Sequence, residues 1–230
     1  MLAQYITDVR DYLNDMQGQF FPEATLARFI NRARRRVAYA SGCVRIMPDG
    51  VKTHRLQESY PFSDWLSACQ KQHRSVQSIL ACRSLSVAIG VGGWKPMWRR
   101  VVWTDFQARF RIFNGTFYGT VSEPGWWAQY GLGPAAKLYL APIPSQDNPM
   151  DLDLTCIPQP LLTDDDEEII PQPWVDAVPY WAATLCLIQQ QRGEDAQRMA
   201  MLFNQDLPQC AAVVCPQFVA NPYGATLRSA

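Results

Sequence analysis

A short segment of the sequence concentrates the residue type best suited to binding anions. Arg28, Arg32, Arg34, Arg35 and Arg36 lie close together, whereas the whole chain contains only four lysines. The planar guanidinium group binds carboxylates and phosphates through two parallel hydrogen bonds. These arginines therefore suit contact with another protein or with nucleic acid, and a solvated helix face is the third interpretation.

A cluster of carboxylates lies in the second half of the chain, in the segment TDDDEEIIP at residues 163–171. A divalent cation is one candidate ligand, but the cluster lacks the spaced pattern of a calcium loop. Negative charge is favoured near a helix N-terminus, so an acidic lead-in to a helix beginning near Pro173 is the simpler interpretation. A sharper hypothesis pairs the cluster with Arg34–Arg36 of the same or a neighbouring subunit; its members are Asp164, Asp165, Asp166, Glu167 and Glu168.

The residues that usually carry catalytic or metal chemistry show no recognised spacing. The chain has seven cysteines and two histidines, but no CxxC pair and no GxSxG, P-loop, GxGxxG or HExxH motif. We therefore expect no enzymatic activity, no cofactor and no metal site. We expect the cysteines to be reduced, mostly buried thiols in a cytosolic context.

The net charge of zero conceals an asymmetry between the two parts of the chain. Through Arg111 there are 17 Lys and Arg against eight Asp and Glu, a net charge of +9. The remainder has four basic and 13 acidic residues, a net charge of −9. This division predicts either contact of the basic part with nucleic acid or pairing of basic and acidic surfaces within or between subunits, and the balance of charges favours pairing.

The composition is typical of a globular protein, with 48% hydrophobic and 18% charged residues. No apolar run is long enough to span a membrane, and charges in the first 15 residues argue against a signal peptide.

Helical spacing of apolar residues predicts a helical hairpin over residues 1–43. Gly18 and Gly42 mark its stops. The first apolar stripe comprises Tyr5, Ile6, Val9, Leu13 and Met16, and the second comprises Leu26, Phe29, Ile30, Ala33, Val37 and Ala40. The five arginines fall off the second stripe, so we expect them on the exposed arc of that helix.

Residues 44–170 are predicted to form a β-rich domain. Alternating and β-branched residues predict strands within 73–94, 98–121, 135–144 and 150–161, with a hairpin turn at Asn114–Gly115. Helical spacing returns over 171–215, where Pro179 is expected to kink one helix and Gly193 to separate it from the next. Residues 216–230 are expected to form an extended arm.

The fold class predicted from these segments is α+β. A helical bundle forms from the N-terminal hairpin and the C-terminal helices, with an inserted, mainly antiparallel β domain and an extended C-terminal arm.

Two stretches of the sequence resemble one family of structural proteins. The opening YITDVRDYLNDMQGQFFPEATLARFINRARRRVAYASGCVR resembles the helical hairpin that begins the head-to-tail adaptor (connector) proteins of tailed bacteriophages. The stretch from Trp127 to Ile188 resembles the strand, acidic loop and return helix of the same family. The resemblance runs in the same order from Tyr5 to about Leu207. Pro208 departs from the family pattern and is expected to cut the last helix short.

This resemblance implies a ring, usually dodecameric, beneath the portal, which extends the DNA channel and supplies a platform for the tail. The implied partners are further copies of the chain, the portal protein, a tail or nozzle protein, and genomic DNA in transient non-specific contact, with no membrane. The implied location is the head–tail junction of the virion, after assembly in the host cytoplasm. The arginines and the acidic cluster would form the subunit or portal interface. The residues implied for an arm that docks on the portal are Gln217, Phe218, Val219, Pro222, Tyr223, Leu227 and Arg228.

Two alternatives remain beside the adaptor. One is a tail-tube or nozzle subunit of the same channel. The other belongs to a different class, a DNA-binding protein that uses the helix face from Arg32 to Arg36, and it predicts salt-sensitive binding to duplex DNA.

Overall fold

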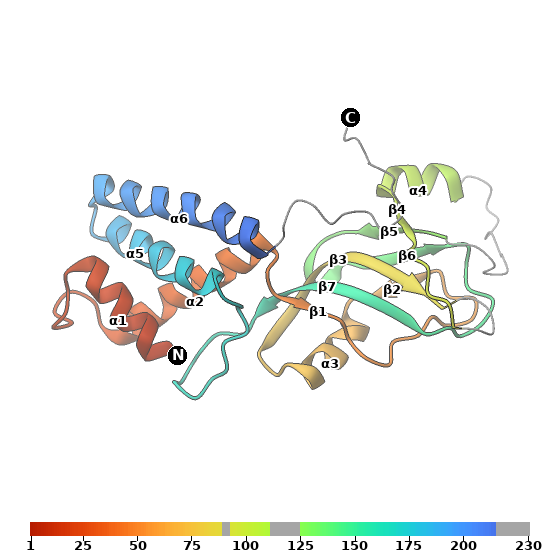
Figure 1. Cartoon of the computed structure of the whole chain (residues 1–230), viewed down its shortest axis with the longest axis horizontal. Helices are drawn as coiled ribbons and strands as arrows, with labels where there is room; N and C mark the ends of the chain where they lie inside the picture. The colour runs from red at the N-terminus through yellow and green to blue at the C-terminus, as the bar shows by residue number, and fades with distance from the viewer. Residues whose placement is uncertain (89–92, 111–124, 215–230) are drawn as a thin grey trace. The chain divides into compact units, whose positions relative to one another are not determined.

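The computed structural model describes residues 1–88, 93–110 and 125–214 (Figure 1). These residues form six α-helices and two β-sheets, so the predicted α+β class is confirmed. The chain divides into two compact units. We call Met1–Gln4 with Arg34–Pro171 the β unit, and Tyr5–Ala33 with Gln172–Ala230 the helical unit. The predicted domain limits at residues 43, 170 and 215 stay a prediction, as does the arrangement of the helices as a bundle.

Four helices contribute to the helical unit. Their bounds are α1 at Leu2–Leu13, α2 at Glu23–Ser41, α5 at Ala177–Gln189 and α6 at Gly193–Val214, and a short 3-10 helix, η2 at Trp174–Asp176, precedes α5. The limits of the unit fall inside α1 and α2, whose outer residues belong to the β unit. None of the helices in the described ranges combines the length and the hydropathy that crossing a membrane requires.

The turn between α1 and α2 is organised by one buried carboxylate. Asp15 is 3% exposed, and its Oδ1 accepts a hydrogen bond from the Gln19 backbone N–H at 2.8 Å. Its Oδ2 accepts from the N–H of Phe20 and of Phe21, each at 3.2 Å. Helix α1 ends at Leu13, so Met16 lies in this turn and is 71% exposed, whereas the sequence predicted it on the buried stripe.

Helices α5 and α6 pack side by side (Figure 1). The Trp181 and Phe203 rings meet with their centroids 4.9 Å apart. Pro179 occupies the first turn of α5, where a backbone N–H needs no intrahelical partner, so the position suits proline. The prediction that Pro208 ends the last helix is wrong, because α6 continues through it to Val214. Buried Phe203 and Cys210 on either side of Pro208 hold the helix against its neighbours despite the lost hydrogen bond.

The β unit contains a three-stranded and a four-stranded sheet. The first has the order β1-β7-β3, with β1 at Arg45–Ile46, β3 at Val76–Val87 and β7 at Met150–Pro158. The second has the order β2-β6-β5-β4, with β2 at Ser59–Pro61, β4 at Arg99–Arg100, β5 at Trp126–Tyr130 and β6 at Lys137–Ala141. The β4–β5 pair is parallel and the other described pairs are antiparallel, so the predicted mainly antiparallel character is confirmed.

Strand pairing places alternate apolar residues in the core of the β unit. Along β3 and β7, Ile79 lies opposite Cys156, Cys82 opposite Leu154 and Leu85 opposite Leu152, and all six side chains are buried. A link between the two sheets comes from Gln129 of β5, whose Oε1 accepts a hydrogen bond from the Cys82 backbone N–H at 3.0 Å. The predicted strands at 73–94, 135–144 and 150–161 are therefore confirmed as β3, β6 and β7.

Two helices of the β unit differ from the sequence prediction. Helix α3 at Ser63–Gln72 buries Trp65 and Cys69 and was not predicted. Helix α4 at Trp103–Phe110 lies where strands were expected to continue. Phe106 of α4 is fully buried against Ala128 and Ala141, because helical spacing brings it together with Trp103 and Phe110 on one face. The predicted turn at Asn114–Gly115 lies outside the described residues.

Replacing Asp15 with alanine is expected to destabilise the α1–α2 turn. The substitution leaves three backbone N–H groups without their acceptor, and the free energy of unfolding should fall by about 1–3 kcal/mol. Denaturant unfolding followed by circular dichroism measures the change. Asp11→Ala, at an exposed position of α1, is the matched control. Equal stability of the two variants would contradict this role of Asp15.

Candidate functional site

Four of the five predicted arginines are exposed along α2. Arg28 and Arg32 lie one turn apart in the helical unit, and Arg35 and Arg36 follow in the part of α2 that belongs to the β unit. The Arg28 guanidinium also lies 5.3 Å from the centre of the Phe29 ring. The exposed arc that the sequence predicted is therefore present at these four positions, which we call the arginine stripe.

Arg34 does not belong to that arc, and its predicted exposure is wrong. Its side chain is 1% exposed, and it forms two parallel hydrogen bonds with Glu168, from Nε to Oε2 at 2.8 Å and from Nη2 to Oε1 at 2.7 Å. Its Nη1 also donates to the Gln159 carbonyl oxygen at 2.6 Å. The signal for burial is position, since Arg34 lies four residues after buried Ile30 and three before buried Val37.

The acidic cluster has several separate structural tasks. Glu168 is turned inward, with its side chain 5% exposed, and its Oε1 also accepts the Ile170 backbone N–H at 2.9 Å. Asp164 binds the first turn of α1, where its Oδ1 accepts the Ala3 N–H at 2.5 Å. This contact places a negative charge at the positive end of that helix. The helix N-terminus that Asp164 serves is therefore that of α1, rather than the one expected near Pro173.

Asp166 closes a turn within the acidic cluster. Its Oδ2 accepts hydrogen bonds from the backbone N–H groups of Thr163 at 2.7 Å and of Leu162 at 2.6 Å. These bonds, the one from Thr163 first, lower the pKa of the Asp166 carboxyl below 3.8 because they favour its charged form. Asp165 and Glu167 are exposed, as is Asp164, whose side chain keeps 58% exposure beside its contact with α1.

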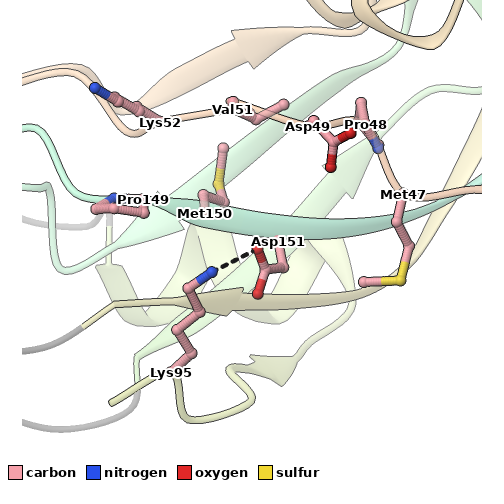
Figure 2. Close-up of a pocket in the computed structure, with 10 residues that line it drawn as sticks. Met47, Pro48, Asp49, Val51, Lys52, Lys95, Pro149, Met150 and Asp151 are labelled. Atoms are coloured by element: carbon pink, nitrogen blue, oxygen red, sulfur yellow. Dashed lines mark hydrogen bonds and ion pairs between the residues drawn. The ribbon is translucent and has the colours of Figure 1, made fainter. Parts of the chain in front are cut away.

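A surface pocket of about 270 Å³ lies between residues 47–52 and 149–151 of the β unit (Figure 2). Figure 2 shows the Lys95 ammonium pointing to Asp151, with Nζ 2.8 Å from Oδ1. The second carboxylate, on Asp49, accepts a hydrogen bond from Gln72 at 2.7 Å. The described lining residues include no Ser, Thr, Cys or His side chain.

The two histidines lie at the surface of the β unit. His54 Nδ1 is 4.0 Å from Asp147 Oδ2, and both side chains are more than half exposed. Asp147 also accepts the Arg55 backbone N–H at 2.7 Å, which makes it part of the local loop structure. Within the described ranges, no three His, Cys, Asp or Glu side chains gather so that they could hold a metal ion.

The cysteines that the structure describes are buried and form no disulfide with one another. Burial raises the pKa of the Cys82 thiol to about 12, and that of Cys186 also to about 12. Cys69 and Cys156 share a hydrogen bond, which lowers the pKa of Cys69 and raises that of Cys156. The residues predicted for the docking arm, from Gln217 to Arg228, lie outside the described residues.

Replacing Arg34 with methionine is expected to destabilise the β unit strongly. The Glu168 carboxylate would stay buried without its partner, which should cost about 3–5 kcal/mol of unfolding free energy. Arg35→Met, at the next and exposed position, is the matched control and should change stability by less than about 0.5 kcal/mol.

The double variant Arg34→Met, Glu168→Leu should recover much of the loss, because it removes both charges together. Denaturant unfolding of the four proteins measures all three effects. A single Arg34→Met variant as stable as its control would contradict the role of the buried pair.

The Asp166 turn is expected to loosen in acid. Because the folded-state pKa is depressed, the carboxylate contributes stability above about pH 4, and this contribution is lost as the pH falls through the lower folded-state value. Hydrogen exchange of the Leu162 and Thr163 amides between pH 5 and pH 2 measures the loss. Asp166→Asn should remove this pH dependence, and an unchanged dependence in that variant would contradict the assignment.

Comparison with known proteins gives the chain its family. A search of curated proteins found no match. The family model described as "SU10 adaptor protein" matches residues 2–213, which include every helix and strand of the structure except the last residue of α6. The match covers both units, and it agrees with the resemblance of the two sequence stretches to phage head-to-tail adaptors. The chain therefore belongs to the SU10 adaptor protein family, a family of phage head-to-tail adaptors.

Proposed function

We propose that this protein forms a ring between the portal and the tail of a bacteriophage and extends the DNA channel. The observation that carries the proposal is the family match over residues 2–213. In the proposed assembly about twelve copies close a ring, the portal contacts one end, and a tail or nozzle protein contacts the other. The protein would act at the head–tail junction of the virion after assembly in the host cytoplasm.

The charged surfaces support a role in assembly. A closed ring of identical subunits needs two different and complementary faces on each copy. The arginine stripe supplies an exposed basic face, and Asp165 and Glu167 are exposed on the acidic cluster. Arginine is also the charged residue that protein interfaces favour.

The arginine stripe also determines how strongly the protein could contact DNA. Tight phosphate binding would hinder the passage of a genome, so a channel subunit should bind duplex DNA weakly. Burial of Arg34 removes one of the five arginines from any surface that DNA could touch. We therefore propose transient, non-specific contact with the genome in the channel.

The proposed protein is structural, with no enzymatic activity and no cofactor. Asp164, Asp166 and Glu168 of its acidic cluster are engaged in helix capping, turn formation and a buried ion pair, and these are tasks of folding rather than of catalysis. The C-terminal residues Gln217–Arg228 are proposed to dock on the portal or on the adjacent copy.

A second candidate follows from the exposed arginine stripe. A DNA-binding protein would use the same side chains to contact phosphates, and binding would weaken steeply with salt. A tail-tube or nozzle subunit is the neighbouring alternative within the same channel.

Electron microscopy of the purified protein mixed with the portal protein of the same phage tests the proposal. We expect a ring of this protein stacked coaxially on the portal. Rings that form without engaging the portal would favour the tail-tube alternative. Protein without rings, together with salt-sensitive duplex binding that Arg32→Ala, Arg35→Ala and Arg36→Ala abolish in combination, would favour the DNA-binding alternative.

A further inference from the structure

Carboxylates gather on one side of the helical unit, around a pair of tyrosines. The Tyr12 and Tyr180 rings lie with their centroids 5.1 Å apart, which brings α1 and α5 together. Asp8 lies one helical turn before Tyr12, and Asp176 lies four residues before Tyr180. Asp11 is exposed on α1 next to Tyr12. We call these three carboxylates and two tyrosines the acidic face.

The acidic face concentrates negative charge around Asp8. Burial, then Asp11 and then Asp176 raise the pKa of the Asp8 carboxyl, so the charges found to act on Asp8 among the described residues are both negative. Arg10, on the same helix, is instead directed to Glu23, with Nη2 3.5 Å from Oε1. Like charges held together are unfavourable in the isolated subunit, and a basic partner would relieve that cost.

Helix α6 adds a further carboxylate to this side of the unit. Asp206 and Asp176 both contribute to raising the pKa of the Cys210 thiol, after burial, so both lie near it. The Cys210 Sγ is itself 3.7 Å from the Pro173 carbonyl oxygen, at the start of η2. Asp206 Oδ2 is shielded from solvent.

The helical unit also carries a matching basic surface. Arg28 and Arg32 are both exposed, and their spacing on α2 places their Cβ atoms about 6 Å apart. Asp8 and Asp11, three residues apart on α1, have a similar separation. Tyrosine and arginine are the residue types, with tryptophan, that most often dominate binding energy at protein interfaces.

We propose that the acidic face of one copy binds Arg28 and Arg32 of a second copy of this chain. The contact is heterologous, because each copy offers its acidic face to one neighbour and its arginines to the other. It rests on the proposed function, since repetition of such a contact around an axis closes the ring. The occupant is a second copy because the complementary charges at matched spacing are found on the same unit of the same chain.

Two charge-reversed variants of the full chain test this contact. The first carries Asp8→Lys and Asp11→Lys, and the second carries Arg28→Glu and Arg32→Glu. Each places like charges across the contact, so copy–copy association should weaken on the order of a hundredfold. In a mixture, every contact between unlike variants again pairs opposite charges, so the two should assemble as a ring in which they alternate.

The readout is the number of adaptor copies per portal, measured by mass photometry and electron microscopy, with sedimentation of the adaptor alone. Asp105→Lys with Glu194→Lys, which has the same charge change as the first variant at exposed positions, should assemble normally. Circular dichroism checks that each variant is folded.

The outcomes separate this inference from the proposed function. If the wild type forms rings on the portal and both reversed variants do so as well, the inference is overturned and the adaptor function still stands. Loss of rings in the variants without recovery in their mixture would assign the faces to the portal or tail protein, and would also overturn the copy–copy contact. Wild-type protein that forms no ring would overturn the proposed function itself.

Discussion

The buried pair of Arg34 and Glu168 is the interaction on which the loop before the C-terminal helices depends. Two charged side chains leave water only because each satisfies the other through two parallel hydrogen bonds, with the Gln159 carbonyl and the Ile170 N–H taking up further bonding capacity. Both ends of the segment from Gln159 to Ile170 are thereby attached to α2. Between these ends, Asp164 can reach the first turn of α1 and Asp166 can close its own turn.

The charged side chains of the protein fall into two kinds, those that specify local structure and those that are exposed. Arg34, Glu168, Asp15 and Asp153 are partly or wholly withdrawn from solvent and specify local structure; Asp153, for example, pairs with Arg45 across neighbouring strands. The second kind includes the exposed charges of the arginine stripe and of the acidic face. A structural subunit can use the second kind for its partners only because the first kind fixes the backbone that presents them.

The elements that sequence reasoning predicted are those whose apolar spacing is regular over many residues. The stripes of α2, β3 and β7 are of this kind, and they define the α+β class. Helix α4 was missed because Trp103, Phe106 and Phe110 are also good strand formers. Only their packing on β5 decides between a helix and a strand for this segment. The burial of Arg34 was not predicted because a side chain at the border of an apolar stripe can be either exposed or buried. Here its burial depends on the carboxylate of Glu168, 134 residues later in the chain. The acidic face could not be predicted from the sequence because its residues come from three separate elements, α1, η2 and α5.

The burial of the cysteines has a consequence for chemical durability. A thiol reacts with oxidants and with other sulfur compounds mainly as the thiolate. With a pKa of about 12, Cys82 or Cys186 is a thiolate in only about one molecule in 100,000 at neutral pH. A phage particle leaves the reducing interior of its host for an oxidising medium. Burial of Cys82 and Cys186 therefore slows the reaction of these two sulfur atoms with oxidants in either medium.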